Sequence, residues 1–550
     1  MSNTIKMIVD KIKRNPYWIL LILFALWMCI GIFPLQCYET DGNEIILGCD
    51  VMYQEGWSLP PVYSYEYRMQ PLMTILIVGL KHLMPFLTCE QIYCLLTAIA
   101  SFIFLIGCVA FAEHVTNSSK TKILVAAMLL PEIYAIAMYP NTAIPSVACF
   151  IWALVLMTRK RYCLTALLMC IAVLFRLDIV IVFPAILPLL IFEGKSLVKS
   201  LLISIIYGVV IVGAGLFLFW LMNAEALRTY GSYQQWSQII TPTERFLAIF
   251  GFYSIVYVVL LPIGLIVISL QRRWKELLLV LVPILLLHYV YSGFGNASKH
   301  FLYNAPFVII IGVRALSWLE DVLKNKPVPK WACLILVVLL MIVSVRKRSL
   351  DMPWLQTNPL HQAGMVMPLY SSSQTADSEV SVGIGAGYQL ITNDENMLAS
   401  GHLFYSWYIH SIKQALSDWR EQQVAVLDTA QTSNILTFEW GASAPVASEL
   451  LHRNHQFLLR RGMPEEYRFS VTSPEHQLHF WRIVLPGQVK SDEEMASYIN
   501  HMCKKFHQGD KYIIAASNHY GTSHFLDELV QQGMLSKKAE RLYQVMNPSN

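Results

Sequence analysis

The sequence predicts an all-α, polytopic membrane domain followed by a soluble α/β domain. Of its 550 residues, 55% are hydrophobic and only 14% are charged, whereas soluble globular chains carry about 25% charged residues. Long apolar runs fill residues 17 to about 345 and then stop. Beyond Arg346 no run reaches the ~20 apolar residues that a spanning helix needs. The expected domains are therefore 1–345, in the membrane, and 346–550, which is soluble.

The overall charge and the cysteines exclude several other classes of protein. The net charge of +4 and the isoelectric point near 8.4 are too mild for a nucleic-acid-binding protein, so no nucleic-acid partner is expected. The 11 cysteines show no paired CxxC spacing, which argues against a zinc module and a disulfide-stapled fold. A mean hydropathy of +0.47 agrees with an integral membrane protein.

The soluble tail contains short runs typical of both strands and helices. Its mixed order favours an α/β fold with its own core. The expected strands are 379–385, 423–428 and 511–516, and the expected helices are 492–506 and 523–532.

Lysine and arginine counts predict the orientation of the chain. The first apolar segment, Tyr17–Pro34, follows four basic residues, so it is expected to run outward from a cytoplasmic amino terminus into an acidic outside loop, 36–72. The short segment Met73–Leu87 carries Lys81 in its interior. If this segment spans, Arg159–Arg161 fall outside, whereas an interfacial or re-entrant segment keeps the basic loops inside. The second arrangement gives about eleven spans and an extracytoplasmic tail, as in a bacterial inner-membrane protein with a periplasmic domain.

The outside loop contains an amphipathic helical pattern from Asp41 to Gln54, which Gly56 ends. Asp41 and Glu44 share one face of this helix, while Asp50 is expected on the opposite side. A carboxylate on a surface helix is placed to act as a general base near a lipid headgroup. The alternative is that the loop is acidic only because positive charge is kept inside.

The spacing within this loop resembles the first loop of GT-C glycosyltransferases, which are polytopic enzymes that use lipid-phosphate sugars. In the bacterial aminoarabinose and protein-mannosyl branches the loop begins Asp-Glu, whereas here Gly42 stands at the second position and Glu44 is the nearest acid. The matching residues are Asp41, Met52, Gly56-Trp57, Tyr67 and Gln70-Pro71-Leu72.

A second stretch, 137–181, is similar to the lipid-phosphate-mannose-dependent mannosyltransferases of GPI-anchor and N-glycan-precursor synthesis. Both resemblances together cover roughly residues 17–345. The segments that carry the second one are Pro140-Asn141-Thr142, Phe175-Arg176-Leu177-Asp178, Tyr63–Arg68 and, more faintly, Ser298-Lys299-His300-Phe301.

Several candidate residues have both a functional and a purely structural interpretation. Arg176 and Asp178 interrupt apolar runs, where ionisable groups are functional candidates, but they also suit a mutually satisfied pair between two half-spans. Lys299 and His300 could hold a phosphate leaving group, or the lysine could snorkel to the interface. Asn141 could bind substrate or cap a helix.

The resemblance implies an inverting transferase that moves a sugar, mannose by preference, from a polyprenyl- or dolichyl-phosphate donor to a glycan, lipid or protein acceptor on the outer face. Asp41 would act as the general base, and Arg68, Lys299 or His300 would stabilise the departing lipid phosphate. Glu44, Arg176, Asp178 and Asn141 complete the expected substrate site. No metal ligands are predicted, and a divalent cation at Asp41 is left open.

Two alternatives remain at this stage. One is a non-catalytic polysaccharide or lipid transporter, although the break near Arg176 comes without the internal repeat common in transporters. The other is a GT-C enzyme with a different donor sugar. Cys37 and Cys49 share the outside loop and are compatible with either a disulfide or two thiols.

Overall fold

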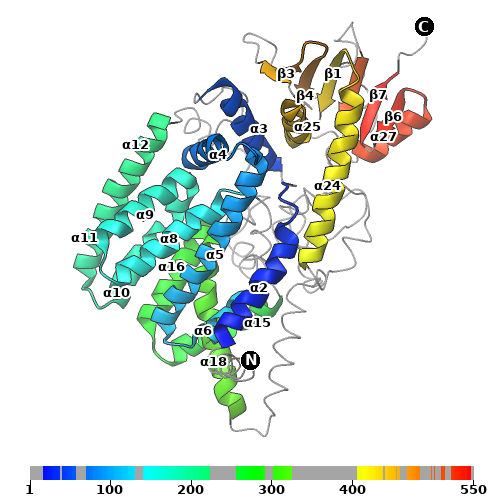
Figure 1. Ribbon diagram of the computed structural model, residues 1–550. Helices are drawn as coiled ribbons and strands as arrows, with labels where there is room; N and C mark the ends of the chain where they lie inside the picture. Colours follow the sequence, from blue (N-terminus) through cyan, green and yellow to red (C-terminus); the bar gives the residue numbers. More distant parts are fainter. Residues whose placement is uncertain are drawn as a thin grey trace, which may run out of the picture.

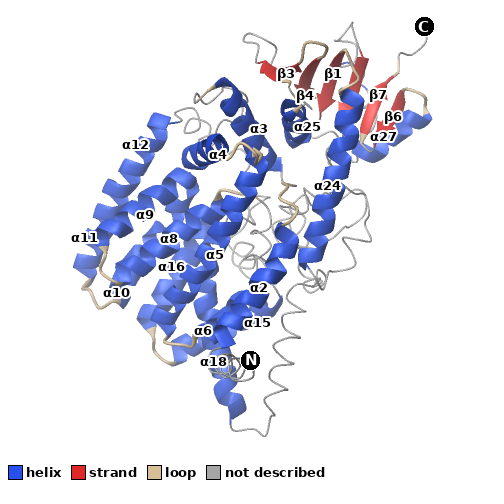
Figure 2. Ribbon diagram, in the orientation of Figure 1, coloured by secondary structure: helices blue, strands red, loops and turns tan. Residues whose placement is uncertain are grey.

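The computed structural model describes residues 16–37, 40–56, 70–130, 140–222, 255–291, 302–324, 405–437, 440–453, 455–458, 467–482, 497, 501, 510–514, 522–539 and 541–546. These residues form a helical bundle with a domain of strands and helices at one end (Figure 1). All the described strands belong to this C-terminal domain, and the described part of the bundle is entirely helical (Figure 2). The expected order of a helical domain followed by an α/β domain is therefore confirmed.

The bundle consists of helices of very different lengths, several of which are broken by short 3₁₀ or π segments. In chain order they are α2 Pro16–Ile32, α3 Thr40–Glu55, α4 Pro71–Leu83, α5 Cys89–Thr116, α6 Lys120–Met128, α8 Ala143–Thr158, α9 Tyr162–Phe175, η2 Leu177–Ala185, α10 Ile186–Phe192, α11 Leu197–Ile206, η3 Tyr207–Val212, α12 Gly213–Met222, α15 Ile255–Leu270, α16 Trp274–Tyr291, η5 Leu302–Asn304 and α18 Ala305–Lys324.

The outer surface of the bundle is apolar. Leu197–Met222 forms a continuous apolar helical rod of 26 residues. Only 17% of its most apolar 18-residue stretch is buried inside the protein. Large side chains on it, including Leu201, Ile205 and Val209, are about half exposed or more. A continuous apolar surface of this size is unfavourable in water and fits contact with lipid chains. The chain is accordingly an integral membrane protein.

The central helix α5 is the other long apolar helix among the described residues, with 28 residues and 61% of its most apolar window buried. It begins with a capping box in which Thr88 accepts from the backbone N–H of Gln91 at 3.1 Å, and the Gln91 side chain accepts from the Thr88 N–H at 3.0 Å. The other apolar helices of the described part are shorter. The total of about eleven spans therefore stays a prediction.

Helix α4 corresponds to the ambiguous segment that begins at Met73. Its 13 residues span about 20 Å, which is less than the ~30 Å hydrocarbon core of a bilayer. The Lys81 ammonium donates to the carbonyls of Pro85 and Leu87, at 2.8 and 2.7 Å, just beyond the end of the helix. This length agrees with the interfacial or re-entrant alternative.

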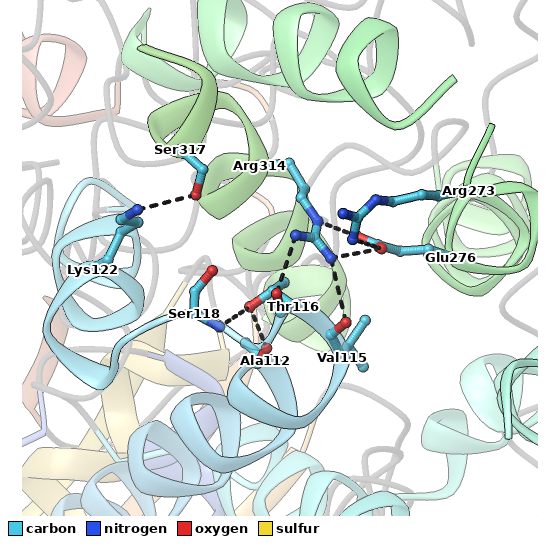
Figure 3. Close-up of polar contacts among 9 residues, drawn as sticks. All are labelled: Ala112, Val115, Thr116, Ser118, Lys122, Arg273, Glu276, Arg314 and Ser317. Carbon is cyan, nitrogen blue, oxygen red and sulfur yellow. Dashed lines mark hydrogen bonds and ion pairs between the residues drawn. The ribbon is translucent and has the colours of Figure 1, made fainter. Parts of the chain in front are cut away.

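A buried ion pair holds the carboxyl end of α5 (Figure 3). Arg314 of α18 donates from Nε and Nη2 to the two carboxylate oxygens of Glu276, at 2.6 and 2.8 Å, and from Nη1 to the carbonyl of Thr116, at 3.1 Å. Nearby, Lys122 bonds to Ser317 at 3.2 Å. A cation at a helix carboxyl end is favourable, because the last carbonyls carry partial negative charge.

The C-terminal domain contains a mixed seven-stranded sheet, in the order β2-β3-β4-β1-β5-β7-β6. The central strand β1 pairs in parallel with β4 and β5, and its buried run of side chains is typical of a strand covered on both faces. The other pairs are antiparallel. The elements are α24 Tyr405–Leu427, β1 Thr432–Thr437, α25 Trp440–His452, β2 Gln456–Leu458, β3 Tyr467–Thr472, β4 Gln477–Arg482, β5 Asp510–Ile514, α27 Thr522–Gln531, β6 Leu535–Ala539 and β7 Leu542–Val545.

The predictions for the tail are partly confirmed. Strand β5 and helix α27 match the expected strand at 511–516 and helix at 523–532. The strand expected at 423–428 is wrong, because these residues end the long helix α24. The expected strand at 379–385 lies outside the described residues, as does most of the expected helix at 492–506.

Helix α24 attaches the C-terminal domain to the bundle by packing along α2 (Figure 1). Its His410 Nδ1 donates to the Phe33 carbonyl at 2.7 Å, and its Lys413 Nζ donates to the Ile32 carbonyl, also at 2.7 Å. Burial lowers the pKa of the Lys413 ammonium to about 8. The end of α2 is thus bonded to two side chains that lie near the beginning of the tail.

Candidate functional site

The first-loop helix is present as predicted. Helix α3 runs from Thr40 to Glu55, and Asp41 is its second residue. It ends at Gly56, whose φ of +106° lies in the region that glycine tolerates best. Glu44 is buried, with 3% of its surface exposed, and so does not face bulk solvent.

Four members of the predicted site are not described at the level of side chains. The side chain of Asp41 is one of these, although its backbone is placed in α3. Arg68, Lys299 and His300 lie outside the described residues altogether. Their roles as base and phosphate ligands therefore remain predictions.

The Arg176 and Asp178 pair lies where the helix breaks, as the interrupted apolar runs predict. Helix α9 ends at Phe175 and the 3₁₀ helix η2 begins at Leu177. The Arg176 Nε lies 2.9 and 3.0 Å from the two Asp178 carboxylate oxygens, and both side chains are largely buried. These distances confirm that Arg176 and Asp178 bond to each other at a helix break.

Two further side chains extend this pair into a polar cluster. Arg176 donates from Nη1 to the Thr142 hydroxyl at 3.1 Å, next to the start of α8. The Tyr303 hydroxyl, in η5, donates to Asp178 Oδ1 at 2.7 Å. The cluster therefore joins three segments that are far apart in the sequence.

Asn141 makes a capping contact. Its Oδ1 accepts from the backbone N–H of Ile144 in the first turn of α8, at 3.0 Å. Its own N–H donates to the Thr97 hydroxyl of α5, at 3.2 Å. The structure thus gives Asn141 the helix-capping role that the sequence left as one of two options.

The polar cluster and α3 meet at one apolar core. Phe175, directly before Arg176, belongs to the same group of packed side chains as Ile45 and Met52 of α3 and Met73 of α4. The structure therefore brings the break at Arg176 to the end of the bundle where α3 lies.

An apolar cavity of about 340 Å³ lies beside this core, between α4, α5, α8 and α9. Its lining includes Met73, Ile99, Trp152 and Phe175, and almost all of its exposed wall is apolar. The one indole N–H in the wall, that of Trp152, donates to the Ile103 carbonyl at 2.9 Å. Such a cavity suits a hydrocarbon ligand and offers little to a polar one.

Arg420 of α24 holds the C-terminal domain against α3, a contact that no local sequence pattern predicts. Its Nη1 lies 2.8 and 2.9 Å from the two carboxylate oxygens of Glu90, at the start of α5. Its Nη2 donates to the Cys37 carbonyl at 2.6 Å and to the Asn43 side chain at 3.1 Å. Asn43 is two residues from Asp41. We call Arg420, Glu90, Cys37 and Asn43 the α24 clamp.

A second contact joins α3 to helix α25. Asp50 is 4% exposed, and its Oδ1 lies 3.4 Å from Nε2 of His452. Burial opposes charging of His452, but the Asp50 carboxylate outweighs it, so the pKa of His452 is raised. The side of α3 opposite Asp41 is therefore covered by the C-terminal domain.

The two cysteines of the first loop are separate thiols. Cys37 and Cys49 are both buried and free. Burial, with the neighbouring Asp50 carboxylate, raises the pKa of the Cys49 thiol. The disulfide option left open by the sequence is not realised, and these thiols behave as packing groups.

The helical bundle and the docked α/β domain have the GT-C fold that the sequence resembles. Among solved structures, the chain is similar to the crystal structure of ArnT from Cupriavidus metallidurans in the apo state, with a TM-score of 0.51 and 12% identity over 96% of this chain and 97% of that chain. The structure of ArnT bound to undecaprenyl phosphate gives 0.47 and 11%, over 96% and 98% of the two chains. No protein-family description and no curated protein matches the sequence. At this identity the similarity establishes the fold.

Proposed function

We propose that this chain is an inverting glycosyltransferase that takes its sugar from a polyprenyl-phosphate donor. The observation that carries the proposal is the convergence of α3, which bears Asp41, and the Arg176 cluster on one apolar core, within the ArnT fold. A carboxylate and an apolar cavity at one end of a membrane bundle suit an acceptor hydroxyl and an isoprenoid chain. ArnT itself has been crystallised with undecaprenyl phosphate, which supports this class of donor.

In the proposed reaction, Asp41 accepts the proton of the acceptor hydroxyl. The acceptor oxygen forms a bond to the anomeric carbon as the bond from that carbon to the phosphate oxygen breaks. This single displacement inverts the anomeric centre and releases the lipid phosphate with its electron pair. Arg68, Lys299 and His300 are the proposed cations for this leaving group. The sugar is mannose by the resemblance, and the acceptor is a glycan, lipid or protein.

The arrangement of the two ends supports an outside location for the reaction. The C-terminal domain contacts α3 through the α24 clamp, so both lie on the same side of the bundle. Basic residues such as Lys122 and Arg273 gather at the other end, around the Arg314 pair (Figure 3). By the positive-inside rule, we propose that this basic end is cytoplasmic and the C-terminal domain periplasmic, in a bacterial inner membrane.

The test is a direct assay of chemistry on the purified full-length protein. It would be incubated with a panel of polyprenyl-phosphate sugars, with mannose and aminoarabinose among them, and scored for acceptor-dependent release of lipid phosphate. Asp41→Asn should lower turnover about 10²–10⁴-fold, the usual contribution of a general base. A transporter would release no lipid phosphate with any donor.

The control for this variant is Asp418→Asn, since Asp418 is an exposed acid on α24. Asp50, the other aspartate of α3, is a poor control because it is buried against His452. Equal activity of the Asp41 and Asp418 variants would refute the catalytic role of Asp41.

A further inference from the structure

Three side chains of the C-terminal domain converge near the beginnings of strands β2 and β4. Asp428 follows α24, His455 precedes β2 and His476 precedes β4. One ligand atom from each lies within 4.8 Å of the others. They come from three separate connections, so the tertiary fold, and not a local sequence motif, brings them together.

His455 is the best-defined member of this group. It is 4% exposed, and its Nδ1 lies 3.2 Å from the Arg453 carbonyl. Because a carbonyl can only accept, Nδ1 carries the proton, and Nε2 of the neutral ring carries a lone pair. This buried Nε2 has no hydrogen-bond partner and lies 3.5 Å from Asp428 Oδ1. A lone pair directed at a carboxylate is unfavourable unless a cation, either a proton on Nε2 or a metal ion, lies between them.

The positions of His476 and Asp428 also agree with the geometry of a metal site. Nδ1 of His476 lies 3.1 Å from the Ser473 hydroxyl, which leaves Nε2 as its ring nitrogen for a metal. Contacts of this kind orient metal-binding histidines in known sites. Two ligands at the ~2.0–2.1 Å typical of Zn²⁺ in a tetrahedral site are about 3.3 Å apart, close to the separation between His455 and Asp428.

We propose that Asp428, His455 and His476 form a binding site for a divalent transition metal of the zinc type. Two imidazoles and one carboxylate are the ligands such an ion prefers, whereas Mg²⁺ and Ca²⁺ require sites made of oxygen atoms. With three protein ligands, the fourth position takes water. The site is separate from the proposed sugar-transfer reaction and does not depend on it.

The proposed metal site lies next to α3, so a bound ion would affect the packing of that helix. The carbonyl of His455 lies 3.5 Å from Nε2 of Gln54, near the carboxyl end of α3. His452, three residues earlier, lies beside Asp50 of the same helix. An ion bound to His455 would tie the turn after α25 to Asp428 at the end of α24. It would thereby stiffen the surface on which α3 rests.

The experiment measures metal bound to the full-length protein in detergent. After chelator treatment and desalting, the protein would be equilibrated with Zn²⁺ alone, and the bound zinc would be counted by elemental analysis. We expect one Zn²⁺ per chain. His455→Gln and Asp428→Asn should lower the affinity at least about 100-fold, more than the 10–100-fold typical of losing an outer-shell partner. Co²⁺ in place of Zn²⁺ should give the visible absorption of a tetrahedral site.

The matched control is His114→Gln, because His114 is a half-exposed histidine paired with Glu193 elsewhere in the chain. It should bind zinc like the unsubstituted protein. Asp428 is itself partly exposed, so its amide variant should fold even if the buried His455 does not tolerate change. The proposal is overturned if the unsubstituted protein retains no zinc, or if folded Asp428→Asn and His476→Gln bind as tightly as the control.

Discussion

Replacement of Arg420 should loosen the C-terminal domain from helix α3. In the α24 clamp, this side chain makes four hydrogen bonds of 2.6–3.1 Å, and it is 5% exposed. Arg420→Met keeps much of the apolar stem and removes the charge. Glu90, whose side chain is largely buried, then loses its counter-charge, and the loss of one partner of a buried pair typically costs about 3–5 kcal/mol. Such a cost shifts the balance between docked and undocked domains by about 100- to 4000-fold.

Hydrogen exchange of the detergent-purified protein would measure this shift, as faster exchange of the α3 and α24 amides. Arg453→Met is the control, because the ion pair of Arg453 with Glu449 is more exposed and 4.0 Å long. Pairs of that kind contribute only about 0–1 kcal/mol. A double variant, Arg420→Met with Glu90→Gln, should recover part of the protection, since no uncompensated charge remains in the clamp.

Two outcomes would refute this reasoning. Exchange in Arg420→Met that is no faster than in Arg453→Met would mean that the clamp adds little to docking. A double variant as poorly protected as the single one would mean that the lost contacts, and not the stranded carboxylate, set the cost.

Two other predictions concern pH and helix packing. The raised pKa of His452 means that its pairing with Asp50 stabilises the fold below the unfolded pKa of about 6.5 and is lost as the pH rises through the higher folded value. His452→Gln should therefore lower the melting temperature more at pH 6 than at pH 8.5, and an equal loss would contradict this. A Cβ at Gly264 would overlap the Ile311 carbonyl oxygen of the neighbouring helix. Gly264→Ala should cost at least about 1–3 kcal/mol and lower the melting temperature, whereas Gly208→Ala, with open space around it, should not.

Local patterns were enough to predict α3, β5 and α27, but not the end of α24. The run from Gln423 to Asp428 is short and apolar in part, which resembles a strand. Its burial follows a helical period, with Trp419, Gln423 and Leu427 on one face. The buried neighbours Gln423 and Val424 identify the helix, because neighbours in a strand point to opposite faces, whereas positions three and four apart share a helix face.

The side-chain groups that join distant segments could not be predicted from the sequence. Arg420 gives no sign of its partner Glu90, and the spacing of Asp428, His455 and His476 matches no known metal motif. Such groups depend on where helices and strands are placed by the packing of apolar surfaces far from them. The Arg176 pair was recognisable because its two members are adjacent in sequence and lie within apolar runs.

The α24 clamp can form only late in synthesis of the chain, because its two charged residues lie far apart in the sequence. Glu90 precedes Arg420 by 330 residues. At about 5–20 residues per second, a ribosome needs roughly 17 to 66 s to reach the arginine after it has made the glutamate. During that interval the start of α5 carries a carboxylate without its final partner. The end of the bundle that carries α3 therefore reaches its mature form only when the C-terminal domain has been synthesised.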